Sequence, residues 1–134
     1  MIQIVTGALI HEGRVLLVHR SPERAVYPNV WDLAGGHMEP GETELAALAR
    51  ELDEELGVQI TPGSAIHLCR LQVGRGEDPV HFSAWIVGEW EGGPTNAAPD
   101  EHDEIRWFRP EELPPLAHEP VGTALREAVR GARA

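Results

Sequence analysis

Runs of branched and aliphatic residues divide the chain into short extended segments separated by polar turns. Such runs predict β-strands, and they lie at residues 2–10, 15–20, 30–33, 65–73, 80–89 and 104–108. The segment His11-Glu12-Gly13-Arg14 is expected to join the first two strands as a hairpin. Segments rich in Gly, Pro, Asn and Asp predict loops, and they lie at residues 21–29, 74–79 and 91–103.

Helical periodicity replaces the strand pattern in two places. Leucines recur every three or four residues between positions 43 and 56, which predicts an amphipathic helix there. A second helix is expected at 123–130, and a short turn or helix at Pro110. Strands and helices in this order predict an α/β fold, a single domain over residues 1–134 with helices on both sides of a mixed sheet.

The helix at 43–56 has recognisable ends. Pro40-Gly41 predicts a turn before it, and Thr43 or Glu42 is suited to cap its first N–H groups. Gly57 is expected to end the helix in the left-handed conformation that glycine adopts at low cost. The sequence therefore places a turn, a helix and a stop within a few residues of one another.

The same helix carries an acidic sector. At roughly 100° per residue, Glu51, Glu54 and Glu55 fall on one side, next to the leucine stripe. Three such carboxylates repel one another unless a cation lies between them. Oxygen ligands of this kind suit Mg2+ or Mn2+, which usually also contact substrate phosphates. Arg50 is expected either to hold one of these carboxylates or to reach back to Glu42.

An ordinary amphipathic helix with a solvated acidic face is the alternative interpretation. The segment Leu33-Ala-Gly35-Gly36 favours the metal site, because it predicts a glycine-rich turn just before the acidic helix. Paired glycines let the backbone approach a ligand closely and turn a carbonyl toward an ion. We therefore expect a divalent metal site between this turn and the helix.

Composition fits a small enzyme. The chain has 134 residues, of which 42% are hydrophobic and 25% charged, and these values are typical of soluble globular proteins. No apolar run reaches the length of a membrane span, and the N-terminus begins in strand-like sequence without a secretory signal. We therefore expect a cytoplasmic protein without a membrane partner.

The net charge of the chain restricts the classes of partner further. A net charge of −11 argues against long nucleic acids, whose binding usually requires a basic patch. It does not argue against a nucleotide, because divalent cations screen the phosphates from acidic side chains. His67, His81 and His102 lack the spacing of zinc ligands, so no zinc site is expected.

The segment from Gly36 to Val58 carries a specific motif. It reads GHMEPGETELAALARELDEELGV and matches every fixed position of the pattern G-x5-E-x7-R-E-U-x-E-E-x-G-U, where U is aliphatic. In this motif the chain resembles the Nudix hydrolases, and the order of its predicted elements is similar to that family over nearly its whole length. The resemblance implies a Nudix-type α/β/α sandwich, with the motif helix packed on a mixed sheet.

The resemblance also implies an activity, the hydrolysis of a pyrophosphate bond in a nucleoside diphosphate linked to another group. By this resemblance, Glu51, Glu54, Glu55 and the Gly35 carbonyl hold Mg2+, for which Mn2+ substitutes. Glu51, or a carboxylate from the 91–104 loop, accepts a proton from the attacking water. Glu54 shares the catalytic role, and Arg50 orients the carboxylates.

Three segments resemble the MutT branch of the family, which acts on nucleoside triphosphates: residues 31–36, 90–94 and 114–121. This resemblance implies Mg2+-dependent conversion of NTP or dNTP to the monophosphate and pyrophosphate, with the removal of modified nucleotides as a role. The MutT pattern has a loop glutamate where this chain has Ala98, and several neighbours are near enough to replace it. These are Asp100, Glu101, Asp103 and Glu104.

Four residues are predicted to contact the substrate. Arg20 and His37 are candidates for phosphate, with exposed surface positions as the alternative. Phe82 is a candidate for stacking on the base, with core packing as the alternative. His118 occupies the position of a base-reading Asn in MutT. An imidazole has one donor and one acceptor on opposite sides of its ring, which weakens selectivity for oxidised guanine.

Two other functions stay open at this point. One is cleavage of a nucleoside diphosphate sugar such as ADP-ribose. The other is a non-catalytic Nudix domain that binds a nucleotide as a sensor, although the complete set of three glutamates argues against it. The sequence leaves the base, the sugar and the choice between monomer and homodimer undecided.

Overall fold

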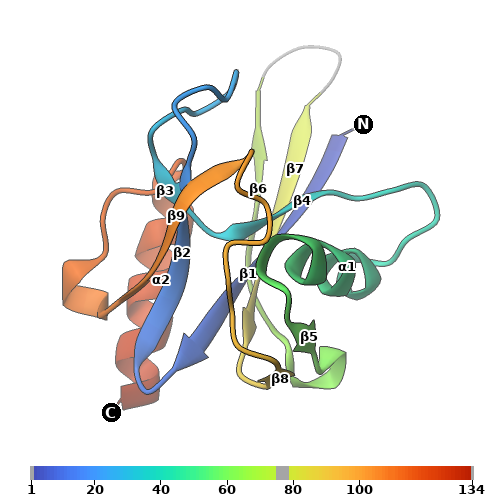
Figure 1. The fold of residues 1–134 in the computed structure, drawn as a ribbon. Coiled ribbons are helices and arrows are strands. Elements are labelled where there is room, and N and C mark those ends of the chain that lie inside the picture. The colour runs from blue at the N-terminus through green and yellow to red at the C-terminus, as the bar shows by residue number, and fades with distance from the viewer. Residues whose placement is uncertain (1, 75–78, 134) are drawn as a thin grey trace.

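The computed structural model describes residues 2–74 and 79–133, so most of the loop predicted at 74–79 lies outside the described residues. A mixed sheet forms the centre of the fold (Figure 1). Its strands are β1 (Ile2–His11), β2 (Arg14–Arg20), β3 (Trp31–Asp32), β4 (Ala34–His37), β6 (Ile66–Val73), β7 (Val80–Val87) and β9 (His102–Phe108).

Strand β1 connects the two halves of this sheet. Along one edge it pairs in parallel with β7, from Ile2 opposite Val80 to Leu9 opposite Val87. Its other edge is shared, because the first part pairs antiparallel with β4 and the end pairs with β2. Strand β2 then pairs antiparallel with both β3 and β9. The sheet therefore branches between β4 and β2.

Two helices, α1 (Glu44–Leu56) and α2 (Glu119–Arg133), cover opposite faces of the sheet (Figure 1). Successive residues of a strand point to opposite faces, and the core follows this alternation. Val5 and Leu9 of β1 pack with α1, whereas Ala8, between them in sequence, packs with Leu125 and Val129 of α2. The predicted α/β/α sandwich is confirmed.

The motif helix has the predicted ends. The Thr43 hydroxyl accepts a hydrogen bond from the Ala46 N–H at 3.1 Å, which caps the first turn. Gly57 ends α1 at φ 69°, and its N–H donates to the Asp53 carbonyl. Leu48, Leu52 and Leu56 are buried under the helix, as their spacing predicts.

The glycine-rich turn predicted at Leu33–Gly36 is wrong. Ala34, Gly35 and Gly36 belong to β4, which pairs with β1 in the register Thr6 opposite Gly35. Both glycines let the β4 backbone come close to a neighbouring group, because they have no side chain. A Cβ on Gly35 would lie 2.1 Å from the Val5 carbonyl oxygen, and one on Gly36 would lie 2.7 Å from Glu51 Oε2. The separate turn predicted at Pro40-Gly41 is confirmed.

Smaller differences concern short elements and their bounds. Strand β5 (Gln59–Ile60) pairs with β8 (Trp90–Glu91) in a small second sheet that hydrophobic periodicity does not reveal, because two residues are too few. Two 3-10 turns lie at Pro62–Ser64 and, as predicted, at Pro110–Glu112. Helix α2 begins at Glu119 instead of residue 123, since proline is tolerated in a first helical turn and Pro120 does not delay it.

Neither α1 nor α2, the helices of the described part of the chain, has both the length and the apolar character needed to cross a membrane.

Candidate active site

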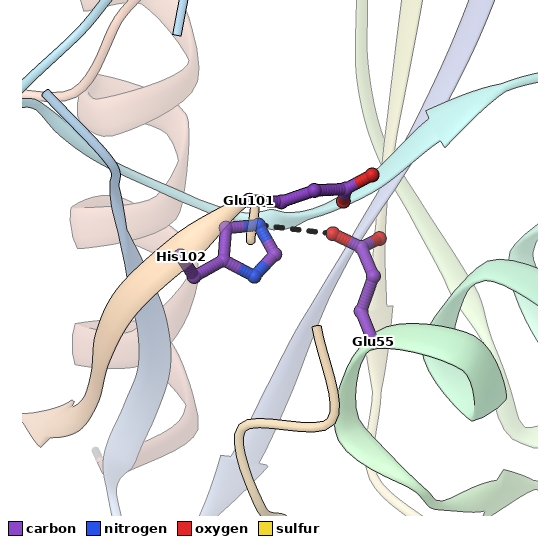
Figure 2. Close-up of side chains that lie close together, drawn as sticks. All are labelled: Glu55, Glu101 and His102. Atoms are coloured by element: carbon purple, nitrogen blue, oxygen red, sulfur yellow. Dashed lines mark ion pairs between the residues drawn. The ribbon is translucent and has the colours of Figure 1, made fainter. Parts of the chain in front are cut away.

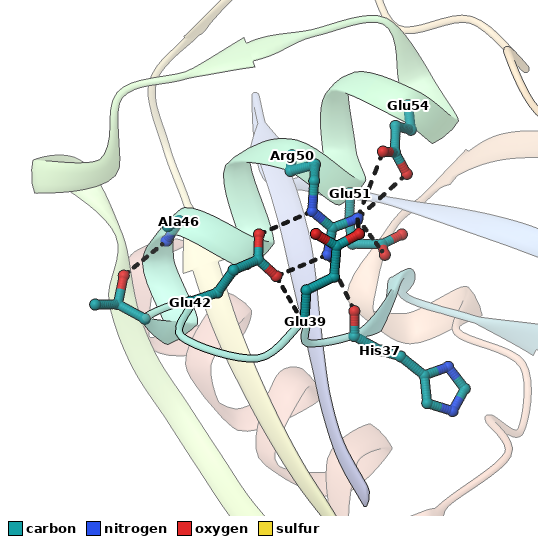
Figure 3. Close-up of polar contacts among 8 residues, drawn as sticks. His37, Glu39, Glu42, Ala46, Arg50, Glu51 and Glu54 are labelled. Atoms are coloured by element: carbon teal, nitrogen blue, oxygen red, sulfur yellow. Dashed lines mark hydrogen bonds and ion pairs between the residues drawn. The ribbon is translucent and has the colours of Figure 1, made fainter.

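Arg50 connects helix α1 to the turn in front of it (Figure 3). Its guanidinium donates to both oxygens of Glu42, from Nε at 2.8 Å and from Nη2 at 2.9 Å. Nη1 donates to Glu51 Oε1 at 3.0 Å, and Nη2 also donates to the His37 carbonyl at 3.1 Å. The two alternatives left open by the sequence both occur, because one planar guanidinium reaches the turn and the helix together.

The turn is fixed from within as well. Glu42 Oε1 accepts the Glu39 N–H at 2.7 Å, so this side chain braces the turn. Hydrogen bonds from Arg50 hold the pKa of Glu42 down at about 2, and Glu42 in turn raises the pKa of Arg50. Glu54, four residues after Arg50, is 3.4 Å from Nη1, and 58% of its side chain is exposed.

Glu55 lies in a different environment, although it is the neighbour of Glu54. Only 2% of its surface is exposed. Burial, together with the charges of Glu51 and Glu101, raises its pKa to about 9. Its Oε2 atom has no hydrogen-bond partner among the described residues. Burial also raises the pKa of Glu51. The protein therefore holds a buried carboxylate that favours its neutral form.

Two residues from the β9 end of the chain lie opposite Glu55 (Figure 2). His102 Nε2 is 3.0 Å from Glu55 Oε1, and His102 is 3% exposed. One ligand atom each from Glu55, Glu101 and His102 lies within 4.8 Å of the other two. The spacing argument addressed only a zinc site and did not pair His102 with Glu55, because the two are far apart in sequence and only the fold brings them together.

The candidates for the loop carboxylate have different partners in the structure. Asp103 pairs with His19 at 2.6 Å, and Glu104 pairs with Arg106. Glu101 instead joins the group around Glu55, and its backbone N–H donates to the Ala98 carbonyl. The geometry therefore favours Glu101 as the residue that takes the place expected at Ala98.

This group of residues fits a divalent cation. The buried Glu55 Oε2 lacks a partner among the described residues, and Glu51 approaches the backbone of Gly36 so closely that a side chain there would collide with its carboxylate. Carboxylate oxygens on adjacent helical turns are donors that Mg2+ and Mn2+ prefer.

A second group of predicted residues is aromatic. The His118 ring contacts Phe82 and Tyr27 edge to face, with centroid distances of 4.5 Å and 5.0 Å. His118 Nε2 is buried without a hydrogen-bond partner in the part of the chain that the structure describes. Burial lowers the pKa of His118, so its ring is neutral near pH 7. Tyr27 was not predicted, since it comes from a loop without periodicity.

Arg20 supports the loop that carries Tyr27. Its Nη2 donates to the Val26 carbonyl at 2.7 Å and its Nε to the Tyr27 carbonyl at 2.9 Å. Tyr27 itself is at φ 49°, a conformation that non-glycine residues seldom adopt. The His37 imidazole is exposed and points away from Arg50 (Figure 3). Contact of Arg20 and His37 with a phosphate stays a prediction.

Known proteins are similar to this chain in sequence and in fold. The family model described as the NUDIX domain matches residues 1–129. The CTP pyrophosphohydrolase of Escherichia coli K12 is 34% identical over 135 residues, which cover 100% of this chain and 95% of that protein. The nucleoside triphosphatase NudI of Salmonella typhimurium is 34% identical over 118 residues, covering 82% of this chain and 83% of that protein.

Solved structures are similar to this chain in fold over most of its length. The MutT NUDIX hydrolase from Burkholderia pseudomallei has a TM-score of 0.80 at 27% identity, covering 92% of this chain and 94% of its own. The ORF135 protein of E. coli has a TM-score of 0.78 at 31% identity, covering 99% and 93%. The chain belongs to the Nudix hydrolase family, and it is therefore an enzyme of the pyrophosphohydrolase class that uses a divalent metal.

Proposed function

We propose that this enzyme hydrolyses nucleoside triphosphates between the α and β phosphorus atoms, with Mg2+ as its cofactor, and releases a nucleoside monophosphate and pyrophosphate. The observation that carries the proposal is the buried Glu55 carboxylate, which has an unpartnered oxygen and lies beside Glu51 and Glu101. Relatives matched over most of their length and named as a CTP pyrophosphohydrolase and a nucleoside triphosphatase support triphosphates as substrates.

The residues that would hold the cation are Glu51, Glu54, Glu55 and the Gly35 carbonyl. When bound, a divalent cation neutralises phosphate oxygens and makes a water molecule a stronger nucleophile. Arg50 keeps Glu51 in place through its bond at 3.0 Å, whereas Glu54 is 58% exposed and held by Arg50 only through a longer contact of 3.4 Å, so it can turn toward a ligand more easily. Arg50 thus orients a carboxylate without needing to touch the substrate.

The attacking water must give its proton to a carboxylate. Glu51 and Glu101 are the two that suit this role, one on the helix and one in the loop before β9. Glu51 Oε1 is already engaged by Arg50, whereas Glu101 has a longer ion pair, 3.8 Å to Arg24. Replacing each by Gln at saturating metal distinguishes them, because the loss of the proton acceptor flattens the acidic limb of the pH–rate profile.

The nucleoside end of the substrate binds at the aromatic group of Tyr27, Phe82 and His118. Phe82 and Tyr27 both contact the His118 ring edge to face, with centroids 4.5 and 5.0 Å away, and this group of rings supports an aromatic surface for a base. The buried His118 Nε2 supports one polar contact to the base edge. A single contact predicts modest discrimination among bases.

A product assay tests the reaction. The purified enzyme is incubated with Mg2+ and each of the common nucleoside triphosphates, CTP included, together with oxidised guanine nucleotides and ADP-ribose. Phosphorus NMR then identifies the products. Pyrophosphate with a nucleoside monophosphate is the expected result. Release of inorganic phosphate alone, or cleavage of ADP-ribose with no triphosphate activity, would contradict the proposal.

Two substitutions test the base site. His118→Asn supplies a donor and an acceptor on one amide, so preference for oxidised guanine should rise, by roughly 1 kcal/mol or about fivefold in kcat/KM per added hydrogen bond. The change should appear in KM before kcat, because the contact is equal in ground and transition states. His118→Ala serves as the control, and base ratios identical to wild type in that variant would remove His118 from the site.

A further inference from the structure

The contact between Glu55 and His102 is not part of the motif that identifies the family here, and its geometry is unusual. Two nearly inaccessible side chains meet at 3.0 Å, one at the C-terminal end of α1 and one at the start of β9 (Figure 2). Burying polar groups costs free energy unless they are hydrogen-bonded. A buried pair of this kind therefore calls for an explanation.

The backbone fixes His102 relative to α1. The His102 N–H donates to the Ala98 carbonyl at 3.0 Å, and its carbonyl accepts the Asn96 side-chain amide at 2.8 Å. The same loop is tied to the helix, because the Ala97 N–H donates to the Glu55 carbonyl at 2.9 Å. The Thr95 N–H donates to the Leu56 carbonyl, also at 2.9 Å. Imidazole and carboxylate are thus held at a set distance by the main chain.

The two oxygens of Glu55 differ. Oε1 faces His102 Nε2, whereas Oε2 is buried and has no partner among the described residues. An ionised carboxylate accepts hydrogen bonds only, so a proton on His102 Nε2 satisfies Oε1. Oε2 then stays available for a ligand. Glu101 adds its carboxylate to the same small region.

We propose that His102 is a positioning residue, which donates its Nε2 proton to Glu55 Oε1 and thereby presents Glu55 Oε2 to the divalent cation. The inference rests on the proposed metal site and assigns a role to a residue outside its carboxylates. Partners that hydrogen-bond a metal ligand fix its orientation, and their loss typically weakens metal affinity by roughly 10- to 100-fold.

The alternative is that His102 Nε2 is itself a ligand of the cation. That arrangement gives the cation a nitrogen neighbour, whereas the positioning role leaves it with oxygen ligands only. Mn2+ distinguishes the two, since it suits oxygen sites and is paramagnetic, so that pulsed EPR detects a directly bound 14N.

The experiment compares Mn2+ binding to the metal-free full-length protein in four forms: wild type, His102→Gln, His102→Asn and His67→Asn. A Gln amide nitrogen reaches the position of Nε2 and donates there, but the shorter Asn does not. His67 is the matched control, because its Nε2 also has one side-chain partner, Ser83 Oγ at 3.0 Å, away from the cation site. Free Mn2+ is measured by EPR, and folding by circular dichroism and thermal melting.

We expect His102→Gln to keep the wild-type Mn2+ affinity within a few-fold, and His102→Asn to lose about 10- to 100-fold. Turnover of His102→Asn should recover at high Mn2+, which general structural damage does not produce. His67→Asn should bind as wild type does. Equal affinity in His102→Asn and wild type would overturn the positioning role, and so would strong 14N coupling in the wild-type EPR spectrum.

Glu51→Gln, measured alongside, separates this inference from the proposed function. If wild type binds Mn2+ and Glu51→Gln binds it poorly, the metal site stands, and the His102 variants alone decide the positioning role. If wild type binds no Mn2+ at all, the proposed metal site is wrong and the role of His102 is wrong with it.

Discussion

Helix α1 takes part in two acidic clusters that differ in almost every physical respect. Around Arg50, four glutamates (Glu39, Glu42, Glu51 and Glu54) surround one guanidinium in a partly open setting (Figure 3). In the second cluster, Glu55 and His102 are buried side by side (Figure 2). Glu55 Oε2 and His102 Nδ1 have no hydrogen-bond partner among the described residues. The pKa of Glu42 is lowered to about 2 in the first cluster, and that of Glu55 is raised to about 9 in the second.

The difference shows which carboxylates hold the fold together and which are ready for a ligand. Glu42 has its cation already, because Arg50 is part of the chain, so ionising it favours the folded state. Glu55 has no such cation, and its ionised form is disfavoured until one arrives. Arg50 and Glu42 therefore serve as scaffold, whereas Glu55 is the carboxylate whose ionisation a bound cation would favour most.

The largest expected effect comes from breaking the second cluster. Glu55→Gln keeps the size of the side chain but removes an ionisable ligand oxygen. We expect turnover with Mg2+ to fall by roughly 10²-fold or more, the cost of removing one electrostatic stabiliser from an active site, with the fold retained. Steady-state kinetics and circular dichroism measure both. Wild-type turnover in Glu55→Gln would show that the assigned site is wrong.

A smaller loss should follow from breaking the first cluster. Arg50→Lys keeps the charge, but one ammonium group cannot bridge Glu42, Glu51 and the His37 carbonyl together. We expect kcat/KM to fall about tenfold, equivalent to ~1.4 kcal/mol or one charge-assisted hydrogen bond, with a lower melting temperature. Arg70→Lys, which alters the exposed pair with Glu44, is the matched control and should change neither quantity much.

The two clusters should respond to pH in opposite directions in the metal-free protein. The folded pKa of Glu42 is lowered, so its contribution to stability is complete above its ordinary pKa of 4.5 and is lost as pH falls toward 2. The folded pKa of Glu55 is raised, so its contribution is complete below 4.5 and is lost as pH rises toward 9.

Denaturant titrations with a chelator present measure the free energy of unfolding at each pH. Glu42 and Glu55 should each contribute one slope to this stability profile. Glu42→Gln should flatten the acidic side of the stability profile, and Glu55→Gln the side between pH 5 and 9. Saturating Mn2+ should abolish the second slope only, since the cation keeps Glu55 ionised in the folded state. The same slopes in the variants as in wild type would contradict the assignment of the two pKa shifts.

The smallest effect is expected at the N-terminus of α1, where no metal ligand is involved. Thr43→Ala removes the hydroxyl that accepts the Ala46 N–H and should cost ~1 kcal/mol of stability, a fall of about 4 °C in melting temperature. Turnover at 25 °C should stay unchanged. A parallel loss of activity would mean that the Arg50 cluster depends on the cap as well as on its own bonds.

The sequence alone was sufficient for features that depend on neighbouring residues. The Gly57 stop and the leucine stripe follow from helix periodicity and end chemistry, and the structure confirms them. End chemistry also offered Thr43 and Glu42 as caps, and the structure shows Thr43 in that role. The reach of Arg50 back to Glu42 was one of two alternatives that the sequence offered, and the structure shows that both occur. The family and its fold followed from the spacing of the motif, and the comparisons confirm them.

Only the tertiary structure decided the environment of each carboxylate. Glu54 and Glu55 are adjacent and lie in the same predicted sector, yet one side chain is 58% exposed and the other 3%. The 95–102 loop makes this difference, because it lies against the C-terminal end of α1 and brings His102 to Glu55. Helical spacing determines which side of a helix a residue faces, but burial and pKa depend on what another part of the chain places there.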